Sequence, residues 1–173
     1  MMIYFKARGP FEIPFSTTKT GAKRVESSCR GNFWRSSAGK YRSSRGCYIF
    51  AVRTPRSYVP GYVGKADARF EGEVFTDGKL QRYNSVLANY KKGTPTLFFI
   101  IAPTNKGKPN KSKIAQLERY LIREAKSVNP SLMNKIGIKA PRWGIKGVIR
   151  GGKGKAAGTN AARAIRQMIG LSK

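Results

Sequence analysis

The sequence predicts an α+β fold: a small three-stranded, antiparallel-type sheet flanked by helices, with basic segments before and after it. Between residues 46 and 128 the hydrophobic patterns follow the order strand, strand, helix, helix, strand, helix. Only a short turn separates the first two strands, so they should pair antiparallel. We divide the 173 residues into a basic N-terminal arm with a short hairpin (1–45), a core (46–135) and a basic, Gly/Lys-rich C-terminal extension (136–173).

The N-terminal arm contains two short apolar segments followed by a basic stretch. Residues 1–16 carry the apolar segments on either side of a Gly-Pro turn signal, which predicts a short edge hairpin. Residues 17–45 are rich in Ser, Gly, Lys and Arg, which indicates an irregular arm that is anchored by Phe33 and Trp34, a pair compatible with a short helix. Trp34 and, in the C-terminal extension, Trp143 could stack on bases. We favour the alternative that they anchor their segments on the domain.

Three apolar runs predict the strands of the core. Residues 46–53 form a continuous apolar run that is typical of a strand buried on both faces. A turn at 54–57 leads into residues 58–65, which we interpret as the second strand of a hairpin. Residues 96–101 have the strongest strand pattern in the chain and should complete the sheet.

The predicted helices follow from apolar residues at steps of three and four. Residues 67–75 are compatible with a short helix, and residues 77–91 with a fuller one. Residues 111–128 have the clearest helical pattern, which ends at Asn129-Pro130. Residues 159–169 could form a final basic helix.

The charge of the chain predicts a polyanionic partner. There are 35 Lys and Arg against 8 Asp and Glu, a net charge of +27 that is spread over the whole length. A body this positive repels itself unless it meets a polyanion, and nucleic acid is the expected one. The expected contacts to it are Arg35, Lys40, Lys65, Arg69, Lys79, Arg82, Arg142 and Lys146.

Absent residue types exclude several kinds of chemistry. The chain has no histidine, which excludes catalysis through an imidazole and zinc sites with His ligands. Its two cysteines are too few for a disulfide framework or a Cys-only zinc site. No stretch approaches the roughly 18 apolar residues of a membrane helix, so we expect no membrane partner. The cytoplasm, or another reducing compartment that contains nucleic acid, is the expected location.

Glu118 is the most informative acidic residue. On a helical wheel of residues 111–128 it lies about 40° from Ile114 and projects from the apolar face, beside Ile122. An unpaired carboxylate there is costly, so it should meet a cation. That cation could be a metal ion or, equally, the Lys or Arg of a buried salt bridge. Mg²⁺ needs only one or two carboxylates besides water and a substrate phosphate.

The order of these features resembles the GIY-YIG endonuclease superfamily. The first motif is Gly46-Cys47-Tyr48, with Cys in place of Ile, and the second is Tyr62-Val63-Gly64. Glu118 and Asn134 follow in the family's order, so the resemblance covers residues 46–135. It implies a metal-dependent DNA endonuclease with Mg²⁺ or Mn²⁺ on Glu118, and therefore DNA in preference to RNA as the partner. It also implies that Tyr48 assists the nucleophile, that Tyr62 orders water or phosphate, and that Asn134 positions the phosphate or the fold.

The resemblance also implies an arginine on the scissile phosphate. Arg69 follows Gly64 by five positions, whereas the slot that the family uses, about two helical turns after this glycine, holds Gly72. Lys65, Lys79 or Arg82 could supply the charge instead. We favour Arg69, with Lys65 as its helper, and expect both charges to lower the pKa of the site tyrosines.

Two alternatives to an enzyme remain at this stage. One is a non-catalytic DNA- or RNA-binding protein on the same fold, in which the basic surface alone acts. The other is a structural protein that packs nucleic acid. The second alternative explains the charge of +27 but not Glu118 on an apolar helix face.

Overall fold

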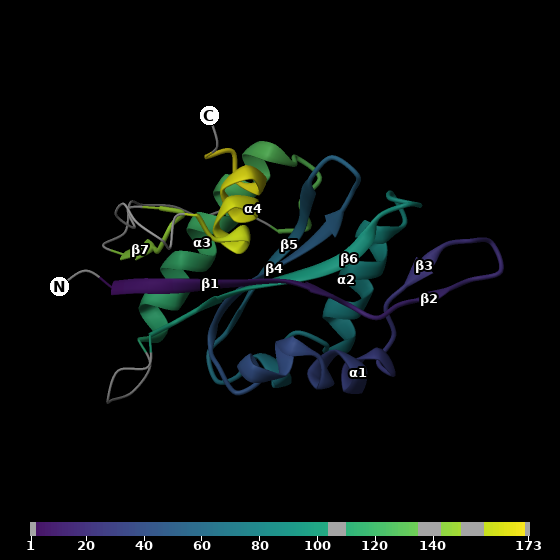
Figure 1. The fold of residues 1–173 in the computed structure, drawn as a ribbon, viewed down its shortest axis with the longest axis horizontal. Helices are drawn as coiled ribbons and strands as arrows, with labels where there is room; N and C mark the ends of the chain where they lie inside the picture. The colour runs from purple at the N-terminus through teal and green to yellow at the C-terminus, as the bar shows by residue number, and fades with distance from the viewer. Residues whose placement is uncertain (1–2, 104–109, 135–142, 150–157, 172–173) are drawn as a thin grey trace.

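The computed structural model describes residues 3–103, 110–134, 143–149 and 158–171 (Figure 1). Their elements are, in chain order, β1 (Ile3–Glu12), β2 (Ser16–Thr17), β3 (Lys23–Arg24), α1 (Cys29–Arg35), the 3₁₀ helix η1 (Ser37–Tyr41), β4 (Gly46–Arg53), β5 (Tyr58–Ala66), the 3₁₀ helix η2 (Phe70–Gly72), α2 (Asp77–Leu87), β6 (Thr94–Ile101), α3 (Lys111–Val128), β7 (Trp143–Ile145) and α4 (Asn160–Met168). None of these helices is both long and apolar enough to cross a membrane.

The main sheet has five strands in the order β5-β4-β6-β1-β7, so the predicted three-stranded sheet is wrong. The predicted strands are β5, β4 and β6, which pair antiparallel at one side of this sheet. Strand β1 adds to β6 antiparallel, and β7 pairs with β1 in parallel. The fold remains α+β, with a mixed sheet and a separate two-stranded sheet formed by β2 and β3.

The edge hairpin predicted from the Gly-Pro signal is wrong, because residues 3–12 form the single strand β1. The pairing with β6 shifts register between Arg8 and Phe11 and then continues to Glu12. An irregularity of this kind accommodates Pro10, which has no N–H to donate to a neighbouring strand. One strand therefore passes through the expected turn and lies inside the sheet, between β6 and β7.

The rest of the N-terminal segment is more regular than expected. The β2–β3 hairpin projects from the body at the end opposite the N-terminus (Figure 1). Helix α1 buries Phe33 and Trp34, and the Trp34 ring stacks on Phe99 of β6 with 6.1 Å between ring centroids. The prediction that this aromatic pair anchors the segment is confirmed.

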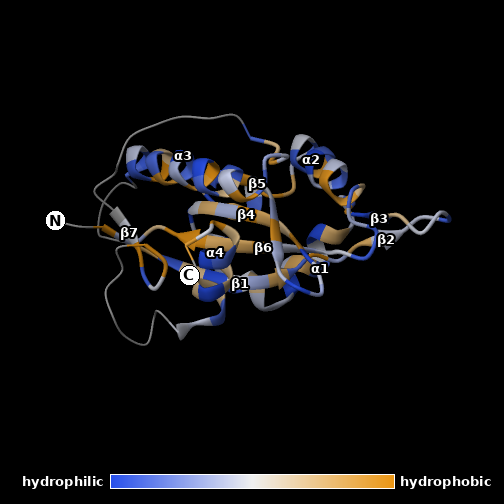
Figure 2. Ribbon diagram, turned by 90° about the horizontal axis from the view of Figure 1, so that it is seen from above, coloured by the Kyte–Doolittle hydropathy of each residue, from blue (hydrophilic) through white to orange (hydrophobic). Residues whose placement is uncertain are grey.

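The two faces of the sheet carry two hydrophobic clusters. Cys47 and Ile49 of β4 pack with the apolar faces of α3 and α4. The alternate residues Tyr48 and Phe50 pack with α1 and α2. Figure 2 shows hydrophobic residues concentrated on the strands and on the helix sides that turn towards them. Strand β4 is thus buried on both faces, as its continuous apolar run predicts.

The glycine of the second motif has a packing role. Gly64 pairs across the strands with Tyr48, whose ring lies over it. A Cβ at position 64 would lie 2.4 Å from the Cζ and hydroxyl oxygen of Tyr48. The Tyr48 side chain is fully buried, so it has little room to move aside.

Gly64→Ala is therefore expected to lower the free energy of unfolding by about 1–3 kcal/mol through overpacking. Chemical denaturation followed by circular dichroism would measure this loss. Gly78→Ala is the matched control, because no atom lies within 4 Å of its added Cβ and position 78 is inside α2. Alanine should stabilise that helix by up to about 1 kcal/mol. Equal denaturation midpoints for the two variants would contradict this packing role.

Candidate active site

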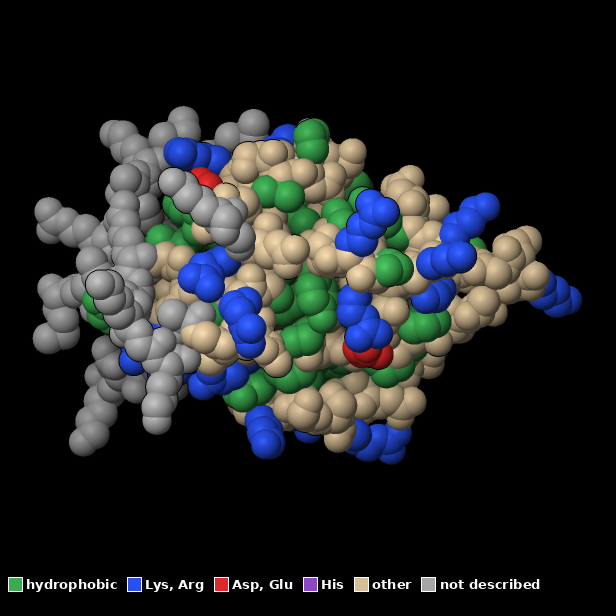
Figure 3. All heavy atoms as spheres, turned by 45° about the horizontal axis from the view of Figure 1, so that its top comes forward, with side chains coloured by type: hydrophobic (Ala, Val, Ile, Leu, Met, Phe, Trp, Pro, Cys, Tyr) green, Lys and Arg blue, Asp and Glu red, His purple; other side chains and the backbone are tan. Residues whose placement is uncertain are grey.

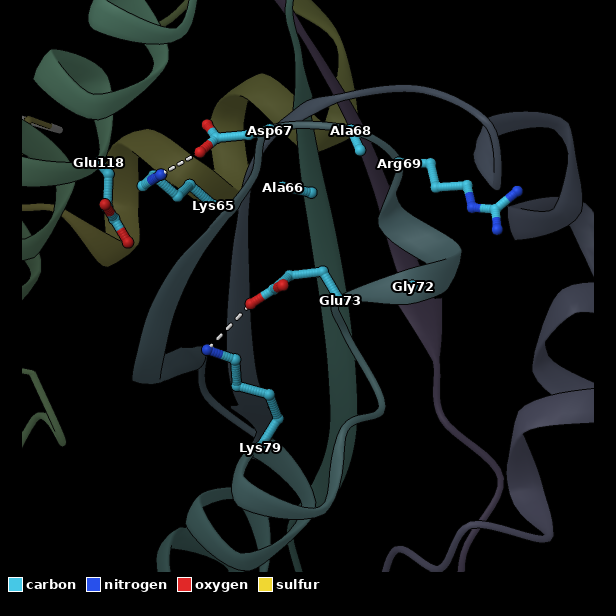
Figure 4. A pocket seen from close by; sticks show the side chains of 9 residues that line it. All are labelled: Lys65, Ala66, Asp67, Ala68, Arg69, Gly72, Glu73, Lys79 and Glu118. Carbon is cyan, nitrogen blue, oxygen red and sulfur yellow. Dashed lines mark hydrogen bonds and ion pairs between the residues drawn. The ribbon is translucent and has the colours of Figure 1, made fainter.

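A cleft opens where β5 ends, between the start of α2 and the middle of α3 (Figure 4). Its volume is about 430 Å³. The residues that line it are Lys65, Ala66, Asp67, Ala68, Arg69, Gly72, Glu73, Lys79 and Glu118. The cleft thus brings together charged side chains from β5, from the connection around η2, and from two helices.

Glu118 is a half-buried carboxylate that has no partner among the described residues. It forms neither a hydrogen bond nor an ion pair with any residue in the described segments, so the alternative of a buried salt bridge is not realised there. Burial raises the pKa of Glu118, and the nearby charges of Lys65 and Lys79 oppose this shift only in part. The anion is therefore incompletely compensated by the protein.

Two lysines face Glu118 across the cleft, and each is held by a carboxylate. Lys65 forms an ion pair with Asp67, and the hydrogen bond between them raises the pKa of Lys65. The Nζ atom of Lys79 lies 3.1 Å from a carboxylate oxygen of Glu73 (Figure 4). Burial lowers the pKa of Lys79, but its bonds to Tyr62 and Glu73 outweigh burial and leave this pKa raised. Both ammonium groups are therefore charged at neutral pH.

Tyr62 is connected to the cleft through Lys79. The Nζ atom of Lys79 donates a hydrogen bond of 2.9 Å to the Tyr62 hydroxyl. The guanidinium of Arg82 lies 5.1 Å from the centroid of the same ring. The Tyr62 side chain is 4% exposed and shares a hydrophobic cluster with Tyr48. Because its hydroxyl accepts from Lys79, its own hydrogen is still free to be donated.

Tyr48 lies away from Glu118, on the other side of the sheet. Its ring is 0% exposed in the cluster under α1 and α2, whereas α3 covers the opposite face. Its hydroxyl is buried beside the hydroxyl of Tyr83, which itself donates to the Val74 carbonyl. Burial, followed by the neighbouring Tyr83 and Tyr62, raises the pKa of Tyr48 far above its usual range. The expectation that neighbouring cations lower this pKa is wrong, because burial dominates.

Arg69 belongs to the wall of the cleft, but its charge lies elsewhere. Figure 4 shows its guanidinium directed away from Glu118, Lys65 and Lys79. Its positive charge instead lowers the pKa of Glu71, after the larger effect of the hydrogen bond from Arg42 to that carboxylate. The structure therefore does not bring Arg69 together with the carboxylate expected to hold a metal ion.

The Asn134 side chain stabilises the fold by bonding to the backbone of β5. Its side-chain oxygen accepts from the Val63 backbone N–H at 2.8 Å, and its amide nitrogen donates to the Val63 carbonyl at 2.7 Å. The side chain of Asn129 also donates to the backbone of β5, at the carbonyl of Pro60. These bonds close the outer edge of β5 and tie it to the end of α3. Of the two roles expected for Asn134, this geometry matches that of positioning the fold.

The other predicted basic contacts are spread over the surface. Arg35, Lys40 and Lys146 are exposed, and Arg142 lies outside the described residues. Lys146 also lines a small hollow with Lys6 and Arg8. Figure 3 shows basic side chains scattered across the visible face, with acidic side chains sparse among them.

Two acidic residues of the cleft were not assigned a role from the sequence. Asp67 follows Lys65 by two positions, which is the spacing that places side chains on one face of a strand, so a local signal for this pair existed. Glu73 meets Lys79 through the turn at η2, and no periodicity in the sequence indicates that contact.

Comparison with protein-family models, with curated proteins and with solved structures finds no match to this chain. The resemblance to the GIY-YIG superfamily therefore rests on the motifs at residues 46–48 and 62–64, on Glu118 and on Asn134. Function has to be inferred from the chemistry of the site itself.

The residues of the cleft fit a divalent cation held by few protein ligands. Within the described segments, no group of three or more acidic or cysteine side chains is arranged around a common point. Glu118 is the uncompensated carboxylate, while Asp67 and Glu73 are engaged by lysines. This set suits Mg²⁺ or Mn²⁺, because Mg²⁺ retains several waters and takes further oxygens from a substrate phosphate.

Proposed function

We propose that the protein is a metal-dependent endonuclease that hydrolyses phosphodiester bonds in DNA. The observation that carries this proposal is Glu118, which has no partner in the described part of the chain and faces Lys65 and Lys79 in a cleft. The chain around this cleft has a net charge of +27. A half-buried anion without a partner is costly, and a bound divalent cation would compensate it. The same cation and the two lysines suit a phosphate group, which the basic surface would recruit.

In this proposal Glu118 holds the Mg²⁺ or Mn²⁺ ion. When bound, the ion acidifies water and neutralises negative charge on the phosphate. Lys79 and Lys65 place fixed positive charge next to the scissile group, where charge increases in the transition state. Tyr62, whose hydroxyl already accepts from Lys79, directs its own hydrogen to the phosphate or to a water molecule.

This assignment differs in two positions from the expectation based on the motifs. Tyr62 replaces Tyr48 as the tyrosine at the reacting group, because its hydroxyl is bonded to Lys79 of the cleft, whereas the Tyr48 hydroxyl lies deeper in the core. Lys79 replaces Arg69 as the principal cation, because its ammonium group contacts Tyr62 whereas the Arg69 guanidinium is directed away from Glu118 (Figure 4). Tyr48 would then support the site by packing over Gly64.

A non-catalytic nucleic-acid-binding protein is the second candidate. It is favoured by the burial of Tyr48 and by the pairing of both cleft lysines with carboxylates, which lowers the positive charge available to a substrate. Either protein would act in a reducing compartment that contains nucleic acid, such as the cytoplasm.

Plasmid cleavage separates the two candidates. Supercoiled DNA incubated with the protein should become nicked or linear in Mg²⁺ or Mn²⁺ and should stay intact in a chelator. Binding measured in the chelator should persist, because most contacts are to phosphates. Binding without cleavage in either metal would establish the second candidate. Cleavage that continues in the chelator would overturn the metal site.

A further inference from the structure

Three arginines converge on Glu71 beside the cleft. Arg42 forms an ion pair with the Glu71 carboxylate. Arg30 of α1 donates from Nη2 to the Glu71 carbonyl oxygen at 3.0 Å. Arg69 immediately precedes η2 and acts on the same carboxylate through its charge. The arginines thus come from three segments of the chain and gather at one exposed place.

The backbone holds this arrangement together. The N–H of Phe70 donates to the Ser44 carbonyl at 2.9 Å, and the N–H of Glu71 donates to the Arg42 carbonyl at 3.0 Å. These two bonds fix η2 against the connection between η1 and β4. Because Arg69 also lines the cleft, the arginine group begins at the wall of the candidate active site.

The group carries more positive charge than its single acid can balance. Among the described residues, Arg30 and Arg69 have no carboxylate within salt-bridge distance. The hydrogen bond from Arg42 lowers the pKa of Glu71, so this carboxylate is ionised and occupies one guanidinium. Exposed ion pairs contribute little to stability, so another anion can replace this carboxylate.

We propose that Arg30, Arg42 and Arg69 form a clamp for a backbone phosphate of nucleic acid next to the cleft, and that Glu71 fills this clamp when no nucleic acid is bound. The clamp rests on the nucleic-acid-binding part of the proposed function and not on cleavage. Guanidinium groups match phosphate because they donate two parallel hydrogen bonds. The clamp is continuous with a cleft that suits phosphate, because Arg69 belongs to both. This continuity favours nucleic acid over an acidic protein as the ligand of the clamp.

Binding of a short labelled DNA duplex, measured by fluorescence anisotropy in a chelator, tests the clamp. Binding at low salt should weaken by about 10-fold in each of three variants, Arg30→Gln, Arg42→Gln and Arg69→Gln. The slope of log K against log salt should also become less steep, by about 0.9 for each phosphate that is no longer neutralised. Arg56→Gln is the matched control, because Arg56 is exposed in the turn between β4 and β5 and has no described ion pair.

Glu71→Gln gives a result that a purely structural arginine group would not produce. Removing the competing carboxylate should tighten DNA binding several-fold, although Arg42 then has no ion-pair partner in the free protein. Circular dichroism melting curves show whether each variant is folded. The proposal is overturned if Glu71→Gln leaves the affinity unchanged while the arginine variants match Arg56→Gln. It is also overturned if polyglutamate competes as well as DNA and with the same dependence on these arginines.

The test of the clamp and the test of the endonuclease give separate results. Altered binding by these variants in a protein that never cleaves would support the clamp and reject the enzyme. If cleavage occurs, Arg69→Gln should raise the DNA concentration needed for half-maximal cleavage by about 10-fold, in line with its weaker binding. A rate loss of about 10²-fold or more at saturation would place Arg69 at the reacting phosphate and would overturn its assignment to the clamp.

Discussion

Glu118→Gln is expected to abolish metal-dependent cleavage, lowering the rate by at least about 10³-fold, while the protein remains folded. Glutamine keeps the size of the side chain but loses the charge that would hold the ion. No Lys or Arg is left without a partner by the change, because Glu118 has no described ion pair. The loss of about 3–5 kcal/mol that follows the breaking of a buried ion pair should therefore not occur.

Melting curves at several pH values provide an independent measurement on the same variant. Burial raises the folded-state pKa of Glu118 above its ordinary value of 4.5. At pH values between the ordinary pKa and the raised folded-state pKa, the folded protein retains a proton on Glu118 that the unfolded chain has released. The contribution of Glu118 to the free energy of unfolding therefore falls as pH rises. The melting temperature of Glu118→Gln minus that of the wild type should therefore increase as pH rises above 4.5, when both are measured in a chelator.

Glu124→Gln on the same helix is the matched control for both measurements. Glu124 is adjacent to Arg123 and does not line the cleft. Its substitution should leave cleavage nearly unchanged. Adding Mg²⁺ should raise the melting temperature of the wild type but not that of Glu118→Gln, since ligand binding stabilises only the protein that binds. A large drop in the melting temperature of Glu118→Gln without metal would contradict the metal-ligand assignment.

Lys79→Met is expected to lower the single-turnover cleavage rate by about 10²–10³-fold at saturating DNA. The substitution removes the ammonium group that donates to the Tyr62 hydroxyl and faces the cleft. Affinity for DNA should change far less, because many other basic side chains still bind its phosphates. Quenched-flow cleavage at saturation, together with anisotropy, would measure the two effects separately.

Two further variants decide how Lys79 acts. Lys91→Met removes the same charge from an exposed position that does not line the cleft, and should cleave at nearly the wild-type rate. Lys79→Arg keeps the charge and should recover part of the lost rate. Equal rates for Lys79→Met and Lys91→Met would mean that only the overall charge of the protein matters, and would remove Lys79 from the site.

The elements between residues 46 and 128 could be predicted because their signals are local. Apolar residues at steps of three and four indicate α3 wherever the helix packs, and the continuous run at 46–53 indicates a strand covered on both faces. The position of Glu118 at the border of the apolar face of α3 follows from the same helical geometry. Neither inference requires knowledge of a distant segment.

The pairing of β1 with β6 could not be predicted in this way. These strands are distant in sequence, and the Gly-Pro signal at residues 9–10 is the same in a hairpin turn and in an irregular strand. Strand β7 is too short for any periodicity to register. Which strands pair with each other depends on the packing of the whole chain, so the five-stranded sheet can be identified only from the tertiary structure.

The sequence by itself determined the charge of the protein, the main helices and strands of its core, and the one carboxylate that its helix turns toward apolar surroundings. Only the tertiary structure decided that Tyr48 and Glu118 belong to opposite faces of the sheet and that Lys79 reaches Tyr62. The physical reason is that periodicity states which residues share a face of one element. It does not state which element covers that face, because that depends on how distant segments pack.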